Sequence, residues 1–143
     1  MRSREQVVWD FVQGWLRTAE LDCSVADTLQ ERRSEYAEAV AFHSQRAAEK
    51  FIKTLLVRHQ IEFPKTYDIP LLRGLVARID AGLAAQLSFA DWLTPFGVDV
   101  RYPGQTRELP DDLGERALSA ARQVRELVMV ELDSCLRPGR PTS

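Results

Sequence analysis

The chain has 143 residues, of which 45% are hydrophobic and 28% are charged. This balance is typical of globular proteins and excludes a disordered chain, and the length suits one domain with a single core. The formal net charge of −2 gives no overall attraction to nucleic acid. Any site for an anion must therefore be local, built from clustered arginine and lysine.

The cysteines and histidines do not form a metal-binding pattern. Cys23 and Cys135 lie far apart, without CxxC spacing, which predicts free thiols in a reducing compartment. His43 and His59 fall near opposite ends of one predicted helix and cannot share an ion. We expect no metal and no cofactor. The GxGxxG, GxxxxGK[ST], HExxH and GxSxG motifs are also missing, so no residue is assigned a catalytic role.

No apolar stretch approaches the roughly 18 to 20 residues that a membrane span requires, and no secretory signal is visible. The simplest expectation is a cytoplasmic protein without membrane contact. Residues 1–136 are expected to form a single domain. Residues 137–143 contain two prolines and a glycine, which predicts a flexible C-terminal tail.

Two long helices are predicted in the first half of the chain. Ser3 and Gln6 have the spacing of a capping box, and apolar residues then recur at helical intervals as far as Ala26. Residues 30–34 are polar and predict a turn. Ser34 is a plausible N-cap for a second helix over about residues 35–59, which must end before Pro64.

The second half predicts shorter elements and one further long helix. Asp68 can cap a third helix that ends at Gly82, and residues 84–93 predict another short one. Prolines and glycines are expected to break regular structure over residues 94–110, a loop long enough to be functional. The last helix is expected to begin at Asp111 or Asp112. The predicted fold is all-α: an antiparallel up-and-down bundle of four principal helices plus a short extra helix.

The second helix indicates function more than any other segment. Its apolar face comprises Val40, Ala47, Ala48, Phe51, Ile52, Leu55 and Leu56. Arg46, Lys50 and Lys53 border that face and could hold phosphate oxygens, with Glu49 beside them. The alternative is a solvated face with an ordinary Glu49–Lys53 pair, which would leave the clustering of three cations unexplained.

His43, near the start of this helix, has two interpretations. A lone histidine at the edge of a core is more often hydrogen-bonded to a neighbouring helix than catalytic. A catalytic base would need an orienting partner, and neither Glu38 nor Glu49 lies one turn away.

The long loop contains Arg101, Tyr102 and, further on, Arg107. Arg101 could contact a phosphate or carboxylate and Tyr102 could stack on a base. A packed turn with a partly exposed arginine would give the same composition, and both interpretations remain open. Trp92 and Phe96 are expected to anchor the loop to the bundle.

Four segments, taken in order, resemble the motifs of one family. Residues 15–22 (WLRTAELD) are similar to W-L-x-x-A-x-x-D, and residues 42–50 (FHSQRAAEK) to F-H-x-Q-Q-A-A-E-K. Residues 63–69 (FPKTYDI) resemble x-P-x-T-H-D-L. Residues 93–96 (LTPF) with 100–104 (VRYPG) resemble L-T-x-Y followed by x-R-Y-P. The ordered set resembles the HEPN domain family (higher eukaryotes and prokaryotes nucleotide-binding).

The resemblance implies a helical bundle that forms a homodimer and binds nucleotide-like or RNA ligands. Small prokaryotic members often act beside a nucleotidyltransferase of the MNT type, in toxin–antitoxin modules. Many members are metal-independent ribonucleases with an Arg-x(4–6)-His motif. Here no histidine follows Arg101 or Arg107, and Tyr67 stands where the family usually has histidine.

The sequence therefore predicts a non-catalytic protein that binds a nucleotide or similar anion and acts with a small nucleotidyltransferase. The expected ligand contacts are Arg46, Lys50, Lys53, Arg101 and Tyr102, with His43, Glu49 and Arg107 as secondary candidates. Two alternatives remain: a ribonuclease toxin with a diverged active site around Arg101, Tyr102 and His43, or a plain dimerisation or interaction module.

Overall fold

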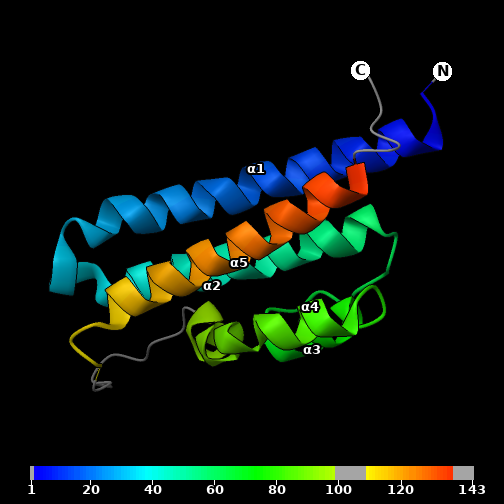
Figure 1. The fold of residues 1–143 in the computed structure, drawn as a ribbon. Helices are drawn as coiled ribbons and strands as arrows, with labels where there is room; N and C mark the ends of the chain where they lie inside the picture. The colour runs from blue at the N-terminus through cyan, green and yellow to red at the C-terminus, as the bar shows by residue number, and fades with distance from the viewer. Residues whose placement is uncertain (1, 99–108, 137–143) are drawn as a thin grey trace.

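The computed structural model describes residues 2–98 and 109–136, without side-chain detail for residues 33, 34, 135 and 136. The described chain is all-helical and contains no strand, as the sequence predicts (Figure 1). Its elements are α1 (Arg4–Gln30), the 3₁₀ turn η1 (Arg33–Tyr36), α2 (Ala37–Arg58), α3 (Ile69–Val76), α4 (Ala81–Gln86), the 3₁₀ helix η2 (Leu87–Gly97) and α5 (Leu113–Leu136). The predicted tail, residues 137–143, lies outside the described residues.

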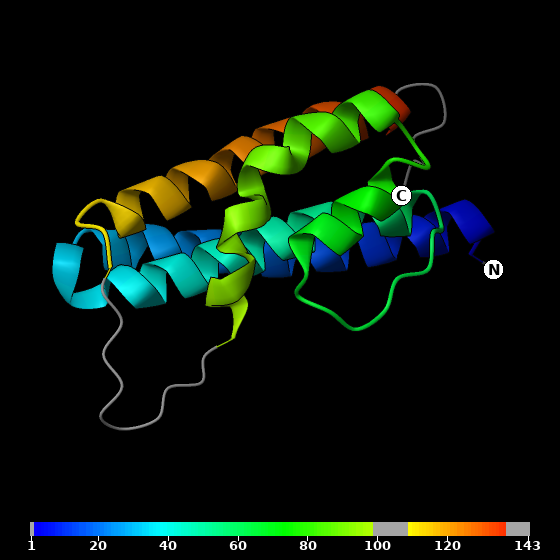
Figure 2. The same cartoon turned by 90° about the horizontal axis from the view of Figure 1, so that it is seen from below.

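Three long helices form the body of the protein. α2 packs against both α1 and α5, and it runs opposite to α1 but in the same direction as α5 (Figure 1). The short elements α3, α4 and η2 make the return between α2 and α5 on another side (Figure 2). α3 has only eight residues and α4 six. A bundle of four principal helices is therefore not confirmed.

The predicted start of α1 is confirmed. The Ser3 hydroxyl accepts a hydrogen bond from the Gln6 backbone N–H at 3.2 Å, and the Gln6 side-chain oxygen accepts one from the Ser3 N–H at 3.1 Å. Ser34, by contrast, is not the N-cap of α2. The chain first makes the turn η1, and α2 begins at Ala37 after Tyr36, which makes no side-chain capping bond.

The region after α2 differs from the prediction in two ways. Asp68 caps α3 as expected, but α3 ends at Val76, because Asp80 accepts from the Leu83 N–H at 3.1 Å and starts a new helix. Gly82 therefore lies inside α4 and does not end the third helix.

The prediction of a single helix over residues 84–93 is also wrong. α4 ends at Gln86 and the chain tightens into η2, which continues through Pro95 to Gly97. Proline and glycine do not break this segment, because η2 has buried positions such as Leu93 that pack it onto the core. α5 begins at Leu113, one or two residues after the expected start at Asp111 or Asp112.

The core contains the whole predicted apolar face of α2, every member of which is fully buried. α1 contributes Val12 and Ala19 to the same core. Val7 and Phe11, which belong to the same periodic pattern of apolar residues, are exposed. Among the described helices, none is long and apolar enough to cross a membrane.

Two polar contacts hold the short elements in place. Arg73 of α3 donates two hydrogen bonds to Asp91 of η2, at 2.8 and 2.7 Å, and this pairing raises the pKa of the guanidinium. The buried Gln45 side chain of α2 donates to the Tyr67 carbonyl at 2.7 Å. A Cβ at Gly97 would stand 2.6 Å from the Gln45 side chain. Gln45 thus joins α2 to the loop before α3 and to the end of η2.

We expect Gly97→Ala to lower the free energy of unfolding by about 1–3 kcal/mol, because the added methyl overpacks a buried contact. Gly74→Ala is the matched control, since nothing lies within 4 Å of its added Cβ. It should raise stability by about 0.5–1 kcal/mol, the usual gain from replacing glycine inside a helix. Urea denaturation followed by circular dichroism measures both. Equal effects at the two positions would contradict the contact.

Candidate functional site

The carboxylate of Asp22, on α1, is shared by two side chains of α2. One Asp22 oxygen lies 2.9 Å from the His43 Nδ1, and the other accepts a hydrogen bond from the Lys50 Nζ at 2.6 Å. The His43 side chain is 29% exposed and that of Lys50 is 25% exposed. We call Asp22, His43 and Lys50 the Asp22 cluster. It presents an oriented imidazole and an oriented ammonium at the surface.

The interpretation of His43 as a histidine bonded to a neighbouring helix is confirmed. Its partner was not recognised from the sequence, because Asp22 belongs to another helix and lies 21 positions away. A signal was nevertheless present. Asp22 is the last residue of the WLxxAxxD motif, and His43 is the second residue of the FHxQQAAEK motif.

The Glu49–Lys53 pair is buried, which contradicts the alternative of a solvated face. The two side chains are 4% and 6% exposed, and the Lys53 Nζ donates to Glu49 at 2.8 Å. The ammonium also lies 5.5 Å from the ring centroids of both Trp15 and Phe63. Cation–π attraction and the carboxylate together compensate the loss of hydration. Lys53 therefore lies beneath the surface, where it holds the Glu49 carboxylate in place.

Arg46 occupies the surface between His43 and Lys50 on α2. Its guanidinium lies 5.3 Å from the Phe42 ring centroid and 3.5 Å from a Glu49 oxygen, with about a third of the side chain exposed. Glu49 thus faces two cations. Across the whole arrangement three cations meet two carboxylates, which leaves one unit of positive charge while His43 is neutral.

Arg101 and Tyr102, two of the expected ligand contacts, and the secondary candidate Arg107 lie outside the described residues. The chain leads toward them from Gly97, which is packed against Gln45 of α2. The Gln45 Oε1 is buried and has no hydrogen-bond partner in the described part of the chain. Trp92 and Phe96 pack against the core and against each other, edge to face at 6.2 Å. They hold η2 on the bundle, whereas most of the loop that they were predicted to anchor lies outside the described residues.

Other titratable residues fit a structural role. Burial raises the pKa of the Cys23 thiol, which keeps it protonated and a poor nucleophile. Burial also lowers the pKa of His59, with the nearby Arg58 adding to the effect. In the two described ranges, no group of three histidine, cysteine or acidic side chains could hold a metal ion.

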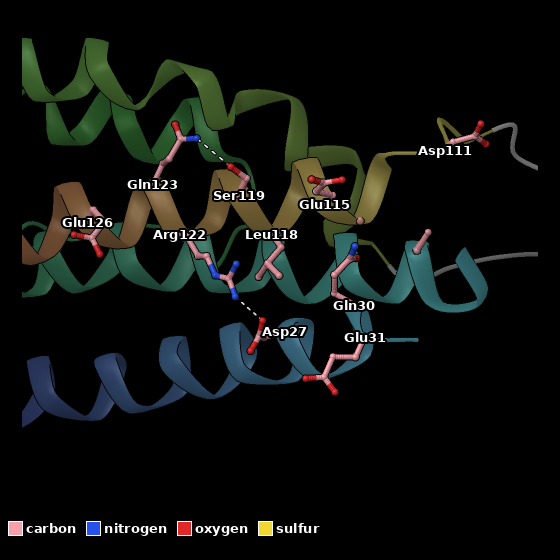
Figure 3. A pocket seen from close by; sticks show the side chains of 12 residues that line it. Asp27, Gln30, Glu31, Asp111, Glu115, Leu118, Ser119, Arg122, Gln123 and Glu126 are labelled. Carbon is pink, nitrogen blue, oxygen red and sulfur yellow. Dashed lines mark hydrogen bonds and ion pairs between the residues drawn. The ribbon is translucent and has the colours of Figure 1, made fainter. Parts of the chain in front are cut away.

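A separate cleft of about 910 Å³ lies between the C-terminal part of α1 and the N-terminal half of α5 (Figure 3). Its acidic lining residues are Asp27, Glu31, Asp111, Glu115 and Glu126. Arg122 also lines it but is bonded to Asp27. The cleft contains no residue of the predicted anion site, and its charge disfavours a phosphate-bearing ligand.

The described chain is all-helical, and Arg46, Lys50 and Lys53 of α2 are held by Asp22 and Glu49 where α1 meets α2. Residues 12–132 match the model of the HEPN domain, so the chain belongs to the HEPN domain family. The match extends from α1 to α5. Comparison with curated proteins and with solved structures found no match.

We expect Lys53→Met to lower the free energy of unfolding by about 3 kcal/mol, because it leaves Glu49 charged and buried with only the longer Arg46 contact. Lys53→Met combined with Glu49→Leu should recover most of that loss. Arg122→Met, which breaks a half-exposed pair, should cost less than about 1 kcal/mol. Chemical denaturation measures all three. A Lys53→Met loss no larger than that of Arg122→Met would contradict the buried pair.

Proposed function

We propose that the protein binds a nucleotide or another phosphate-bearing ligand where α1 meets α2. Arg46 and Lys50 would contact the ligand, with His43 beside them. The supporting observation is that both cations are partly exposed yet already held by carboxylates, Arg46 near Glu49 and Lys50 on Asp22. Such preorganisation lowers the entropy lost when a long side chain orders on a ligand.

Each cation keeps donors for a ligand. An ammonium has three N–H donors and a guanidinium has five, so the contacts to Asp22 and Glu49 do not use them all. Lys53 would act from below by holding Glu49. Arg101, Tyr102 and Arg107 belong to the proposal as the second wall, with the arginines on phosphate and Tyr102 stacked on a base.

Membership of the HEPN domain family supports two further parts of the proposal, a protein partner and a homodimer. The protein would act as a non-catalytic component beside a small nucleotidyltransferase of the MNT type, in a toxin–antitoxin-like module, and it would form a homodimer. Because a fold hosts many functions, co-purification with a co-expressed nucleotidyltransferase is the direct test of that partner.

We expect ATP to raise the melting temperature of the purified protein in a thermal-shift titration. Arg46→Ala or Lys50→Ala should weaken the apparent affinity about tenfold each, since each removes a charge-assisted hydrogen bond. Lys50→Ala with Arg101→Ala should abolish the shift. Arg122→Ala, an arginine in the acidic cleft, should leave it unchanged. If neither ATP nor any other nucleotide produces a shift, the binding function is wrong.

A second function, cleavage of RNA, is favoured by the Asp22–His43 contact. A carboxylate on the Nδ1 of an imidazole fixes the ring and its tautomer and leaves the Nε2 to accept a proton, here from a ribose 2′-hydroxyl. The 2′-oxygen would then attack phosphorus and displace the 5′-oxygen, which takes a proton from water. Arg46 and Lys50 would stabilise the charge on phosphate.

Incubation with total RNA in EDTA separates the two functions. If the protein is a ribonuclease of this kind, His43→Asn should reduce cleavage by a factor of about 10² or more while leaving the melting temperature close to that of the wild type. Cleavage that persists in His43→Asn would exclude this active site. No cleavage by the wild-type protein would leave binding as the function.

A further inference from the structure

The aromatic ring of Phe42, on α2, lies outside the hydrophobic core. Phe42 is partly buried, yet it belongs to neither cluster of core residues in the described chain. The later phenylalanines and tryptophans of the described ranges are all buried in the core or packed against it: Phe51, Phe63, Phe89, Trp92 and Phe96. Core packing therefore does not explain why the side chain at position 42 is aromatic.

Phe42 contacts two residues of the candidate site. Its ring meets the His43 imidazole edge to face, with 5.1 Å between the ring centroids. The Arg46 guanidinium lies over the ring, 5.3 Å from its centroid. Because Arg46 follows Phe42 by four residues, the two side chains lie on the same side of the helix. Phe42 is thus part of the surface that carries the cations of α2.

Two neighbours orient the Arg46 guanidinium. The Phe42 ring lies against it, and an oxygen of the buried Glu49 carboxylate lies 3.5 Å from one of its nitrogens. Glu49 is itself held by the hydrogen bond from Lys53. The Arg46 side chain is nevertheless 35% exposed, so a ligand can reach it. A planar group that is held from two sides and remains accessible presents a flat surface to a ligand.

We propose that this guanidinium, supported by Phe42, is the surface on which the base of a nucleotide stacks. The inference rests on the nucleotide binding proposed above and narrows the ligand class to a nucleoside phosphate, with a purine preferred. Bases stack on arginine planes as they do on aromatic rings, and a purine offers the larger ring area. Arg46 would determine specificity, and Phe42 would be a positioning residue that acts through it.

Arg46 can stack on a base and also contact phosphate. A guanidinium stacks through its faces and donates hydrogen bonds in its plane. Lys50 follows Arg46 by one helical turn, about 6 Å along the axis, so the phosphate of a stacked nucleotide can lie between the two cations. A base has two faces, and stacking on Arg46 therefore leaves the other face for the contact proposed for Tyr102.

Charge alone would not require arginine at position 46. A lysine would carry the same charge and could bind phosphate, but an ammonium has no plane on which a base can stack. The F-H-x-Q-Q-A-A-E-K motif has glutamine at this position, where this chain has Arg46. The stacking surface is therefore a feature of this chain and is not implied by the motif.

AMP and ribose 5-phosphate are the probes that isolate the base, because they share the sugar and the phosphate and differ only in the adenine. Each is used to displace an ATP analogue labelled on its ribose. We expect the inhibition constant of AMP for the wild-type protein to be about tenfold lower than that of ribose 5-phosphate, a factor typical of base stacking. UMP, which has a smaller base, should fall between them.

Substitutions assign this preference to the stack. Arg46→Lys and Phe42→Leu should each reduce the ratio of the two inhibition constants to about two or less, whatever they do to phosphate binding. The double variant should have no lower ratio than Arg46→Lys, because both residues act in one stack. Phe11→Leu is the matched control and should keep the wild-type ratio, since Phe11 is 61% exposed and lies about three turns of α1 from Asp22.

The outcomes distinguish this inference from the function on which it rests. If the labelled ATP does not bind the wild-type protein, both are wrong. If it binds and AMP displaces it no better than ribose 5-phosphate does, the phosphate site stands and the stacking surface is wrong. A wild-type ratio in Arg46→Lys, or a Phe42→Leu variant that loses only thermal stability, would show that the contact between Phe42 and Arg46 is purely structural and would also overturn the inference.

Discussion

The bridge from Asp22 to α2 is the interaction on which the candidate site depends. α2 must bury a broad apolar face between α1 and α5, and it carries an imidazole and three cations directly beside that face. One carboxylate of α1 makes this possible by bonding to His43 and Lys50 together. Without it, the His43 imidazole and the Lys50 ammonium, seven residues apart on the same side of α2, would both lack their partner on α1. The two contacts orient the His43 and Lys50 side chains at the surface.

The Glu49–Lys53 pair is buried beneath the exposed side chains of the candidate site. The Lys53 ammonium lies 5.5 Å from the ring centroids of both Trp15 and Phe63, so the pair also connects α2 to α1 and to the loop before α3. A buried ion pair contributes little net stability but is costly to break, which makes it a device for specificity of packing. In this protein the pair holds the Glu49 carboxylate within 3.5 Å of the Arg46 guanidinium.

Charge is divided between two surfaces of the protein. The cations of α2 gather beside α1, while the cleft between α1 and α5 has five acidic lining residues and one arginine (Figure 3). The small net charge of the whole chain hides this separation. A phosphate-bearing ligand would therefore be drawn to the side of α1 that faces the cations of α2.

The sequence by itself determined the helical class, the starts of α1 and α3 and the buried face of α2, because caps and periodicity are local. It also placed Arg46, Lys50 and Lys53 on one segment. Only the tertiary structure decided which of these cations reach the surface, since Lys53 is covered by rings from two other segments. The Asp22–His43 contact, the restart of the chain at Asp80 and the exposure of Phe11 were likewise decided by packing. Each depends on residues that packing brings together from separate elements, and the spacing of residues along one helix cannot predict which of them meet.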